Sequence, residues 1–355
     1  MNPAFQIRLT GSFLINAVGA AAVIFAHFFV AHFAGANIFG AFAVLFAWLQ
    51  VIVVFAKLGY DTASQKLIAE YVANGQFGHV RGLLRSSVLI VAMASIAGGV
   101  AFWAGAHWLG EPASDRDAVV AAAFLIPTLA LIRLTRGSLL GFQLTVRAQM
   151  FDPAIIYTGW MLLIAVDLWR DIDLSAGRLM YQLLVMGVIA LVGQLLLVRT
   201  ARPAEARTVA PVIQTKYWTR TAVPMLLAYG LVVLMTYTDT ILIGLFLGNE
   251  QAGIYAVASR FATAVSMPIA FLGGALGPVV AELIAKQDLT SLQSRIDATT
   301  RFGLVLGVPL AAILLIGSAA FLGVIGSEYT AGASARRVLI IAHVVNIVVG
   351  PVGLV

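Results

Sequence analysis

Long apolar runs separated by short polar stretches make up nearly the whole chain. No Lys, Arg, Asp or Glu occurs between Arg8 and Lys57, and that stretch is long enough for two membrane spans of about 20 residues each. The segment FAGANIFG, residues 33–40, contains glycine and asparagine and predicts the break between the two spans. Further apolar runs predict spans near residues 83–108, 118–140, 153–168, 179–198, 218–247, 252–284, 302–325 and 338–355, which brings the expected total to ten.

The composition supports the fold class that the pattern predicts. Hydrophobic residues make up 61% of the 355 positions and charged residues only 11%, with a mean hydropathy of +0.97. A soluble domain carries about 25% charged residues. The chain is therefore predicted to be an all-α polytopic membrane protein. It has no cysteine, which excludes disulfides and thiolate chemistry.

The net charge of +6 comes from basic residues in the connections between spans, a pattern typical of membrane orientation and not of nucleic-acid binding. One side of the predicted membrane has Arg8, Lys57, Lys66, Arg81, Arg85, Arg133, Arg136, Arg147, Arg199, Arg202, Arg207, Lys216, Arg220, Lys286, Arg295 and Arg301. The other side has Arg116, Arg170, Arg178, Arg336 and Arg337. The positive-inside rule predicts a cytoplasmic N-terminus, and no nucleic-acid partner is expected.

Two segments of the chain match each other at an offset of 213 residues (253 − 40). NIFGAFAVLFAW and EQAGIYAVASRF share a glycine, an aromatic residue, an alanine and a valine in the same order, beginning at Gly40 and Gly253. Each copy lies in the second span of its half of the chain. At the position of Arg260 the first copy has Ala47, so the shared pattern does not itself require an arginine there.

The repeat predicts two parallel-repeat lobes of six helices each. Six spans precede the second copy's half, so both halves begin on the same side of the membrane, an arrangement that transporters commonly use. We expect residues 1–205 to form the N-terminal six-helix lobe and residues 206–355 to form the first four helices of a C-terminal lobe. The second lobe is therefore expected to be incomplete, as in a fragment of a longer protein.

The same segments resemble a known superfamily. The pattern GxxxxGxYxxAxR after a span with DTILIGLFLG, and LGYDTASQKLIAEYVANGQ after the second span, are similar to polysaccharide exporters of the multidrug/oligosaccharidyl-lipid/polysaccharide (MOP) superfamily. Its O-antigen repeat-unit flippases look most similar. These loose motifs separate the superfamily from other transporters better than they separate its branches.

The resemblance implies alternating access around a partly cationic cavity between two lobes. The cargo would be an undecaprenyl-diphosphate-linked oligosaccharide, moved from the cytoplasmic to the outer leaflet of the bacterial inner membrane. Glycan polymerases and glycosyltransferases of the same pathway would be partners, besides membrane lipids. Related lipid II flippases have an arginine in an AxR context like that of Arg260. The arginine that those flippases have near the start of the first span has no counterpart here, where Asn16 is one of the few polar residues.

Arg260 and Asp239 are charged residues placed inside predicted spans. Arg260 lies ten residues from Glu250, about 15 Å into the membrane, and a charge at that depth is costly enough to suggest a function. Its guanidinium suits a diphosphate, because it stays charged and donates several hydrogen bonds. The alternative is a structural ion pair with Asp239. Asp239 itself is interpreted either as that charge balance or as a coupling site for H⁺ or Na⁺.

Four polar side chains complete the predicted cavity. Arg133 and Arg136 are three residues apart and share one helix face, as headgroup anchors or as a gate that captures the diphosphate. Gln50 and Tyr229, like Asn16, could line a sugar path, although hydrogen bonds between helices are the simpler account.

The sequence favours a carrier over an enzyme. No phosphate-binding loop, HExxH motif or cysteine ligand occurs, and no cofactor is expected apart from a coupling ion. A drug/cation antiporter of the same superfamily is the nearest alternative, although a deep arginine disfavours cationic cargo. A membrane-embedded polymerase or glycosyltransferase would need acidic catalytic clusters or large hydrophilic loops.

Overall fold

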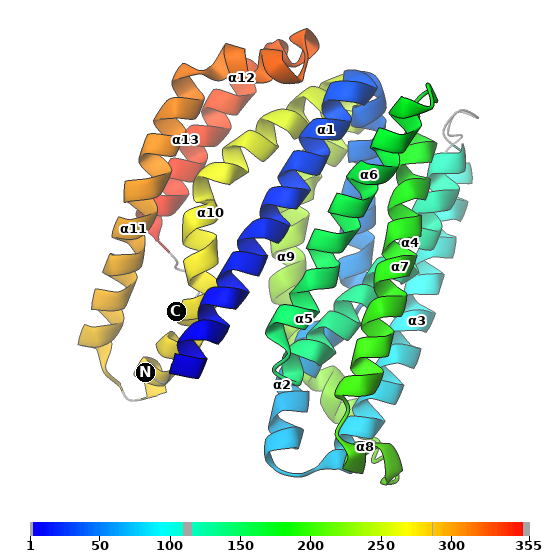
Figure 1. Cartoon of the computed structure of the whole chain (residues 1–355), viewed down its shortest axis with the longest axis vertical. Helices are drawn as coiled ribbons and strands as arrows, with labels where there is room; N and C mark the ends of the chain where they lie inside the picture. The colour runs from blue at the N-terminus through cyan, green and yellow to red at the C-terminus, as the bar shows by residue number, and fades with distance from the viewer. Residues whose placement is uncertain (1–2, 109–115, 286, 351–355) are drawn as a thin grey trace.

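The structure is a computed structural model built almost entirely of long helices (Figure 1). It describes residues 3–108, 116–285 and 287–350, with side chains at all of these except 3–17, 268–279, 281–282, 284–285, 289 and 318–319. The helices are α1 (Pro3–Ala56), α2 (Tyr60–Ala73), α3 (Phe77–Trp108), α4 (Arg116–Gly141), α5 (Thr145–Gln149), η2 (Met150–Ile155), α6 (Ile156–Trp169), α7 (Ala176–Ala201), α8 (Ala204–Thr208), α9 (Thr215–Leu247), α10 (Asn249–Ala285), α11 (Leu289–Ile316), α12 (Ser318–Ile325), η3 (Ser327–Gly332) and α13 (Ala333–Val349). The predicted all-α class is confirmed.

Helix α1 contains two membrane spans joined by a kink. Its 54 residues would extend about 81 Å as one straight helix, far more than the roughly 30 Å of a bilayer core. The backbone leaves the helical conformation at Gly35 (φ 75°, ψ 165°), inside the segment where the sequence predicts the break. Glycine adopts a positive φ without steric cost, so the chain can turn there.

Eight described segments are long and apolar enough to cross a membrane, and the first, Val18–Ala56, includes parts of both halves of α1. The predicted spans correspond to the two halves of α1 and to α3, α4, α6, α7, α9, α10, α11 and α13. One predicted boundary is wrong. The expected span at 302–325 ends at Ile316, and Gly317 separates it from the short helix α12.

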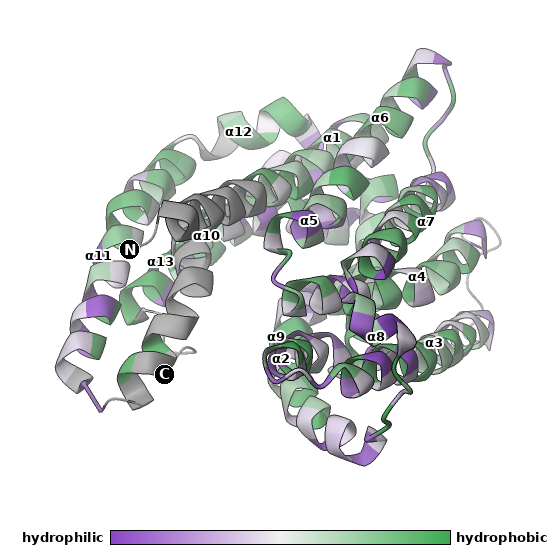
Figure 2. Cartoon of the chain, turned by 60° about the horizontal axis from the view of Figure 1, so that its bottom comes forward, coloured by the Kyte–Doolittle hydropathy of each residue, from purple (hydrophilic) through white to green (hydrophobic). Residues whose placement is uncertain are grey.

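The helices form two lobes with α1 and α9 between them. Figures 1 and 2 show α10, α11 and α13 on one side and α3, α4, α6 and α7 on the other. The larger buried apolar cluster extends from α4 and α7 across α1 to Ile254 and Val257 of α10, and a smaller one lies within the other side. The smaller cluster is formed by Ala262, Val265, Ala311, Leu314, Ile340 and Ile347 of α10, α11 and α13. The exact boundary between the lobes, near residue 205, stays a prediction.

The two glycines matched by the repeat lie against each other where α1 crosses α10. A Cβ on Gly253 would lie 2.2 Å from the carbonyl oxygen of Ala36, and one on Gly40 would lie 1.7 Å from that of Asn249. Each imaginary Cβ is also within about 3 Å of the other glycine's backbone nitrogen. Equivalent helices of the two repeats therefore meet through equivalent glycines.

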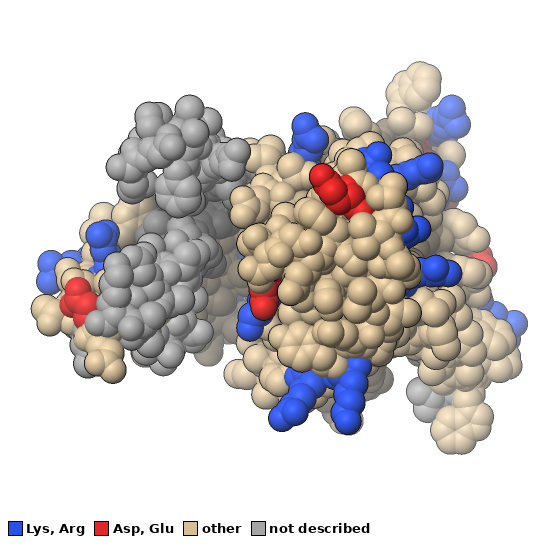
Figure 3. Space-filling view, turned by 90° about the horizontal axis from the view of Figure 1, so that it is seen from below, with Lys and Arg blue, Asp and Glu red and all other residues tan. Residues whose placement is uncertain are grey.

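The molecule has two chemically different ends. We call the end with α2 and α8 the α2 end and the end with α12, η3 and the Gly35 kink the α12 end (bottom and top of Figure 1). Figure 3 views the α2 end, where blue Lys and Arg side chains are widely spread. The α12 end has the exposed aromatic side chains Trp108, Trp169 and Tyr181, which are typical of a membrane–water interface.

Candidate functional site

An arginine of α4 reaches across to α1. Arg133 Nη2 donates a hydrogen bond of 2.8 Å to Oε1 of Gln50, and the Arg133 side chain is partly buried. Donor and acceptor come from different helices, so the bond ties α4 to the second half of α1. A headgroup anchor would extend toward the membrane surface instead. This placement therefore argues against the anchor interpretation of Arg133.

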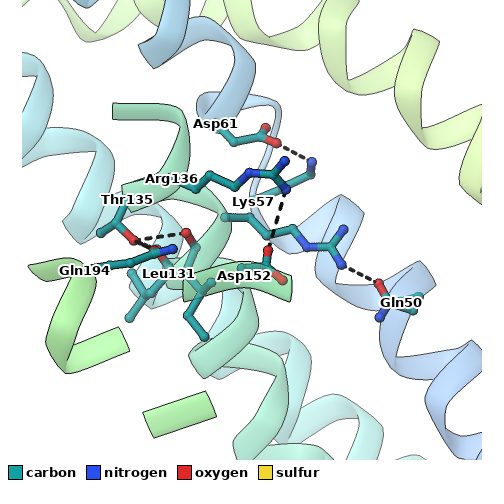
Figure 4. Close-up of polar contacts among 10 residues, drawn as sticks. Gln50, Lys57, Asp61, Leu131, Thr135, Arg136, Asp152 and Gln194 are labelled. Carbon is teal, nitrogen blue, oxygen red and sulfur yellow. Dashed lines mark hydrogen bonds and ion pairs between the residues drawn. The ribbon is translucent and has the colours of Figure 1, made fainter. Parts of the chain in front are cut away.

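Arg136, on the same face of α4, lies opposite an acid. Its Nη1 is 3.6 Å from Oδ2 of Asp152, and its buried Nε has no hydrogen-bond partner in the described part of the chain (Figure 4). Asp152 lies in the π-helical turn η2, where the backbone departs from helical angles (φ −132°, ψ 113°) just before Pro153. Such turns interrupt the regular helix and reorient side chains, and they are frequent at functional sites.

A buried lysine completes this group. Lys57, with only 3% of its side chain exposed, forms an ion pair with Asp61, and its Nζ lies 4.3 Å from the ring centroid of Tyr229 on α9. Burial lowers the pKa of Lys57, the Asp61 carboxylate opposes that shift, and the charges of Arg133 and Arg136 add to it. All three cations therefore lie close enough to influence one another.

We call Lys57, Arg133, Arg136, Asp61 and Asp152 the basic cluster. Three positive and two negative charges leave a net charge of +1 (3 − 2). In a partly buried site such an excess favours the binding of an anion, because the extra positive charge has no counter-charge within the protein.

Arg260 lies on α10 beside a small cavity of about 30 Å³, enough for roughly one or two water molecules. The cavity is lined by His27, Phe39, Ala43, Phe46, Tyr237, Thr240, Ala256, Ser259 and Arg260. The charges of Arg260 and Arg133 both act on Tyr157 of α6, so both arginines lie within electrostatic range of that residue.

His27 forms part of the wall between Arg260 and α6. Its ring is buried and packs against Phe46 and Trp160 at centroid distances of 5.6 Å and 6.2 Å. Nδ1 donates to the carbonyl oxygen of Val23 at 2.6 Å, which leaves Nε2 as an acceptor without a partner among the described residues. In this tautomer the neutral ring can accept a hydrogen bond from a donor in the Arg260 cavity.

The ion pair between Arg260 and Asp239, which was the alternative to a cavity role for Arg260, is absent from the described structure. Asp239 is exposed on α9 and accepts a hydrogen bond of 2.8 Å from the hydroxyl of Tyr255. The physical reason is helix rotation. Tyr237, which faces the Arg260 cavity, precedes Asp239 by two residues, so their side chains point about 200° apart around α9.

The structure thus brings together four of the seven predicted site residues, Arg133, Arg136, Gln50 and Tyr229, whereas Arg260 lines its own cavity on α10. Asp239 lies elsewhere, and the side chain of Asn16 lies outside the described residues. Sequence reasoning counted Lys57 only as an orientation signal and missed Asp61, Asp152 and Tyr157. An acid followed by proline in an apolar run, as in Asp152-Pro153, was the available signal.

A second polar cavity, of about 670 Å³, lies at the α12 end between α6 and α7. Its buried acid, Asp167, accepts hydrogen bonds from both Arg178 and Gln182. These partners satisfy the carboxylate, which makes this a structural connection between α6 and α7.

Two lobes that meet at equivalent helices, with a basic cluster on α2, α4, η2 and the α1–α2 turn beside Tyr229 of α9, fit a membrane exporter of the MOP superfamily, and the family comparisons show that membership. The profile of the polysaccharide biosynthesis protein family matches residues 10–284, and the MatE profile matches residues 224–352. The chain belongs to the polysaccharide biosynthesis protein family. A search of curated proteins finds no match.

Solved structures share the fold at low sequence identity. The inward-facing conformation of a multidrug resistance MATE family transporter of the MOP superfamily aligns with a TM-score of 0.72 and 13% identity, over 93% of this chain and 78% of that one. The outward-facing conformation of such a transporter gives 0.63 and 14%, over 96% and 79%. A MOP superfamily transporter from Pyrococcus furiosus, described as having a binding pocket of reverse polarity, also gives 0.63 and 14%, over 96% and 79%.

Proposed function

We propose that this exporter is a flippase that moves an undecaprenyl-diphosphate-linked oligosaccharide from the cytoplasmic to the outer leaflet. The observation that carries the proposal is the basic cluster, which lies on α2, α4, η2 and the α1–α2 turn beside Tyr229 of α9 and has more positive than negative charge. With Arg260 counted as well, there are four cations and two acids, a net charge of +2 (4 − 2).

The arrangement suits a diphosphate. Two phosphates joined by one oxygen carry about two negative charges, which would balance the excess of the site. Arg133 and Arg136 can each present a flat fork of N–H groups to phosphate oxygens, and Lys57 supplies a compact charge. Tyr157 and Gln50 add uncharged hydrogen-bonding groups of the kind that bind sugars.

The proposed orientation places the N-terminus and the α2 end in the cytoplasm of a bacterial inner membrane. The basic residues of the α2 end support this by the positive-inside rule. The better agreement with the inward-facing relative supports a conformation open toward that end. Cargo would then enter the basic cluster from the cytoplasmic leaflet. Glycosyltransferases would act on the cargo before this exporter, and a glycan polymerase would act on it afterwards.

A drug/cation antiporter is the second candidate, because the solved structures with this fold include multidrug transporters. Asp61 and Asp152 could bind a cationic drug only after their ion pairs with Lys57 and Arg136 were broken. The coupling ion in either case would be H⁺ or Na⁺.

Complementation of a flippase-null strain tests the proposal, with the full-length gene beside Arg260→Ala, Arg260→Lys and Arg133→Ala. We expect loss of glycan export in the alanine variants and partial export in Arg260→Lys, because lysine keeps the charge and loses the fork. Arg295→Ala, on the exposed surface of α11, is the matched control.

Normal export by Arg260→Ala and Arg133→Ala at wild-type protein levels would contradict a diphosphate site. Binding to the purified protein separates the two candidates. Undecaprenyl diphosphate should raise the unfolding temperature and tetraphenylphosphonium should not, whereas a cation antiporter would give the reverse result.

A further inference from the structure

We propose that Glu328 is the principal residue of a latch that closes the α12 end, by capping the kink of α1 from the opposite lobe. The latch consists of Ile325, Glu328 and Tyr329, on α12 and η3, and of the segment 31–36 of α1. It rests on the exporter fold and not on the identity of the cargo.

The main contact is an N-terminal cap supplied by another part of the chain. The backbone N–H of Ala36 donates a hydrogen bond of 2.6 Å to Oε1 of Glu328. Ala36 follows the Gly35 kink directly, so its N–H has lost the carbonyl of His32 that a continuous helix would provide. A carboxylate at this position also meets the positive end of the helix dipole of the second half of α1.

Two further hydrogen bonds join the same elements. The buried hydroxyl of Tyr329 donates to the carbonyl oxygen of Ala31 at 3.0 Å, in the last turn before the kink. His32 Nδ1 donates to the carbonyl oxygen of Ile325 at 2.8 Å. Ile325 is the last residue of α12, so its carbonyl oxygen accepts no hydrogen bond from an N–H group of that helix. Each bond thus satisfies a backbone group at or beside a helix end.

Packing beneath the latch continues the closure. The ring of Phe28 on α1 stacks on the ring of Phe261 on α10 at a centroid distance of 4.4 Å. The guanidinium carbon of Arg336 on α13 lies 5.5 Å from the centroid of the same Phe261 ring. The Gly40–Gly253 crossing lies along the same pair of helices. The lobes cannot separate at the α12 end while these contacts and the three hydrogen bonds persist.

Cysteine accessibility tests the latch, and the absence of native cysteine makes a single reporter unambiguous. Ala258 is fully buried below η3, and a Cβ on Gly332 would lie 3.7 Å from its Cβ. Ala258→Cys in the purified chain should react slowly with a soluble maleimide. Adding Glu328→Ala should raise the labelling rate several-fold, and Glu328→Gln should restore the slow rate, because the amide oxygen accepts the same hydrogen bond.

Glu250→Ala is the control, because the Glu250 side chain is also exposed at the α12 end and has no hydrogen bond or ion pair in the described structure. Tyr329→Phe, which removes one oxygen, should raise the rate less and carries the test if Glu328→Ala does not fold. An unchanged rate in Glu328→Ala, or an equal rise in Glu250→Ala, would overturn the proposal. The readout is independent of cargo, so failure of the latch and failure of the flippase assignment can be told apart.

Discussion

The charged residues of this protein are few, and their pairing differs from what their sequence positions suggest. Lys57 follows the longest uncharged stretch, yet it is buried and paired with Asp61. Asp239 is deep in an apolar run, yet it is exposed and bound to Tyr255. Lys57 lies in the turn between α1 and α2, which brings it onto Asp61, and for Asp239 the rotation of α9 decides the outcome, because one residue of displacement turns a side chain by about 100°.

Removing Lys57 should destabilise the protein more than removing both members of its ion pair. Lys57→Met leaves the Asp61 carboxylate unpaired, and breaking a buried pair costs about 3–5 kcal/mol. Asp61 is partly solvated, so we expect the lower end of that range. Thermal unfolding of Lys57→Met and of Lys57→Met with Asp61→Asn measures the difference. Equal unfolding temperatures of the two variants would show that the unpaired Asp61 carboxylate has no cost.

Arg260 and Asp239 should behave as independent sites. Because the two side chains face different directions, a double-mutant cycle with Arg260→Gln and Asp239→Asn should be additive within about 0.5 kcal/mol of unfolding free energy. An interaction energy well above that value would show that the two residues form the ion pair that the sequence left open as an alternative. The Tyr255→Phe and Asp239→Asn pair is the positive control, because these two residues share a hydrogen bond.

At the scale of elements, glycine positions determine where helices bend and where they touch. Gly35 divides α1 within the segment predicted from the sequence, whereas the break at Gly317 was not expected. The repeat identified Gly40 and Gly253 as equivalent, but it gave no sign that they contact each other. Sequence similarity shows that two helices are alike, and only packing shows that they are neighbours.

Alanine at Gly253 should disturb the crossing of α1 and α10. Its Cβ would lie 2.2 Å from the carbonyl oxygen of Ala36, and overpacking of this kind typically costs about 1–3 kcal/mol. Gly105→Ala on α3 is the matched control, because nothing lies within 4 Å of its Cβ. Thermal unfolding in detergent should show a lower midpoint for Gly253→Ala alone, and equal midpoints would contradict the close approach.

For the whole molecule, the chemical difference between the two ends supports the proposed orientation. The sequence places most basic residues on one side, and the structure gathers the corresponding loops at the α2 end. The aromatic side chains of the α12 end mark the opposite interface. The lobe architecture was also predictable, because the repeat and the even number of spans before it require parallel halves.

Single cysteines test the orientation in intact cells. Gln76 is exposed in the α2–α3 turn and Asp173 in the α6–α7 turn. A membrane-impermeant maleimide should label Asp173→Cys in intact cells and Gln76→Cys only after the membrane is opened. Labelling of Gln76→Cys from outside would reverse the proposed orientation, and with it the direction of export.

The sequence by itself determined the spans, the kink of α1, the repeat and the charge asymmetry. These follow from local composition, because a bilayer sorts segments by apolarity and loops by charge. Only the tertiary structure decided which polar groups meet: Arg133 with Gln50, Arg136 with Asp152, and Glu328 with the Ala36 N–H. Such pairings join residues 16 to 292 positions apart, and they depend on helix rotation, kinks and the closeness of the lobes, which no local pattern contains.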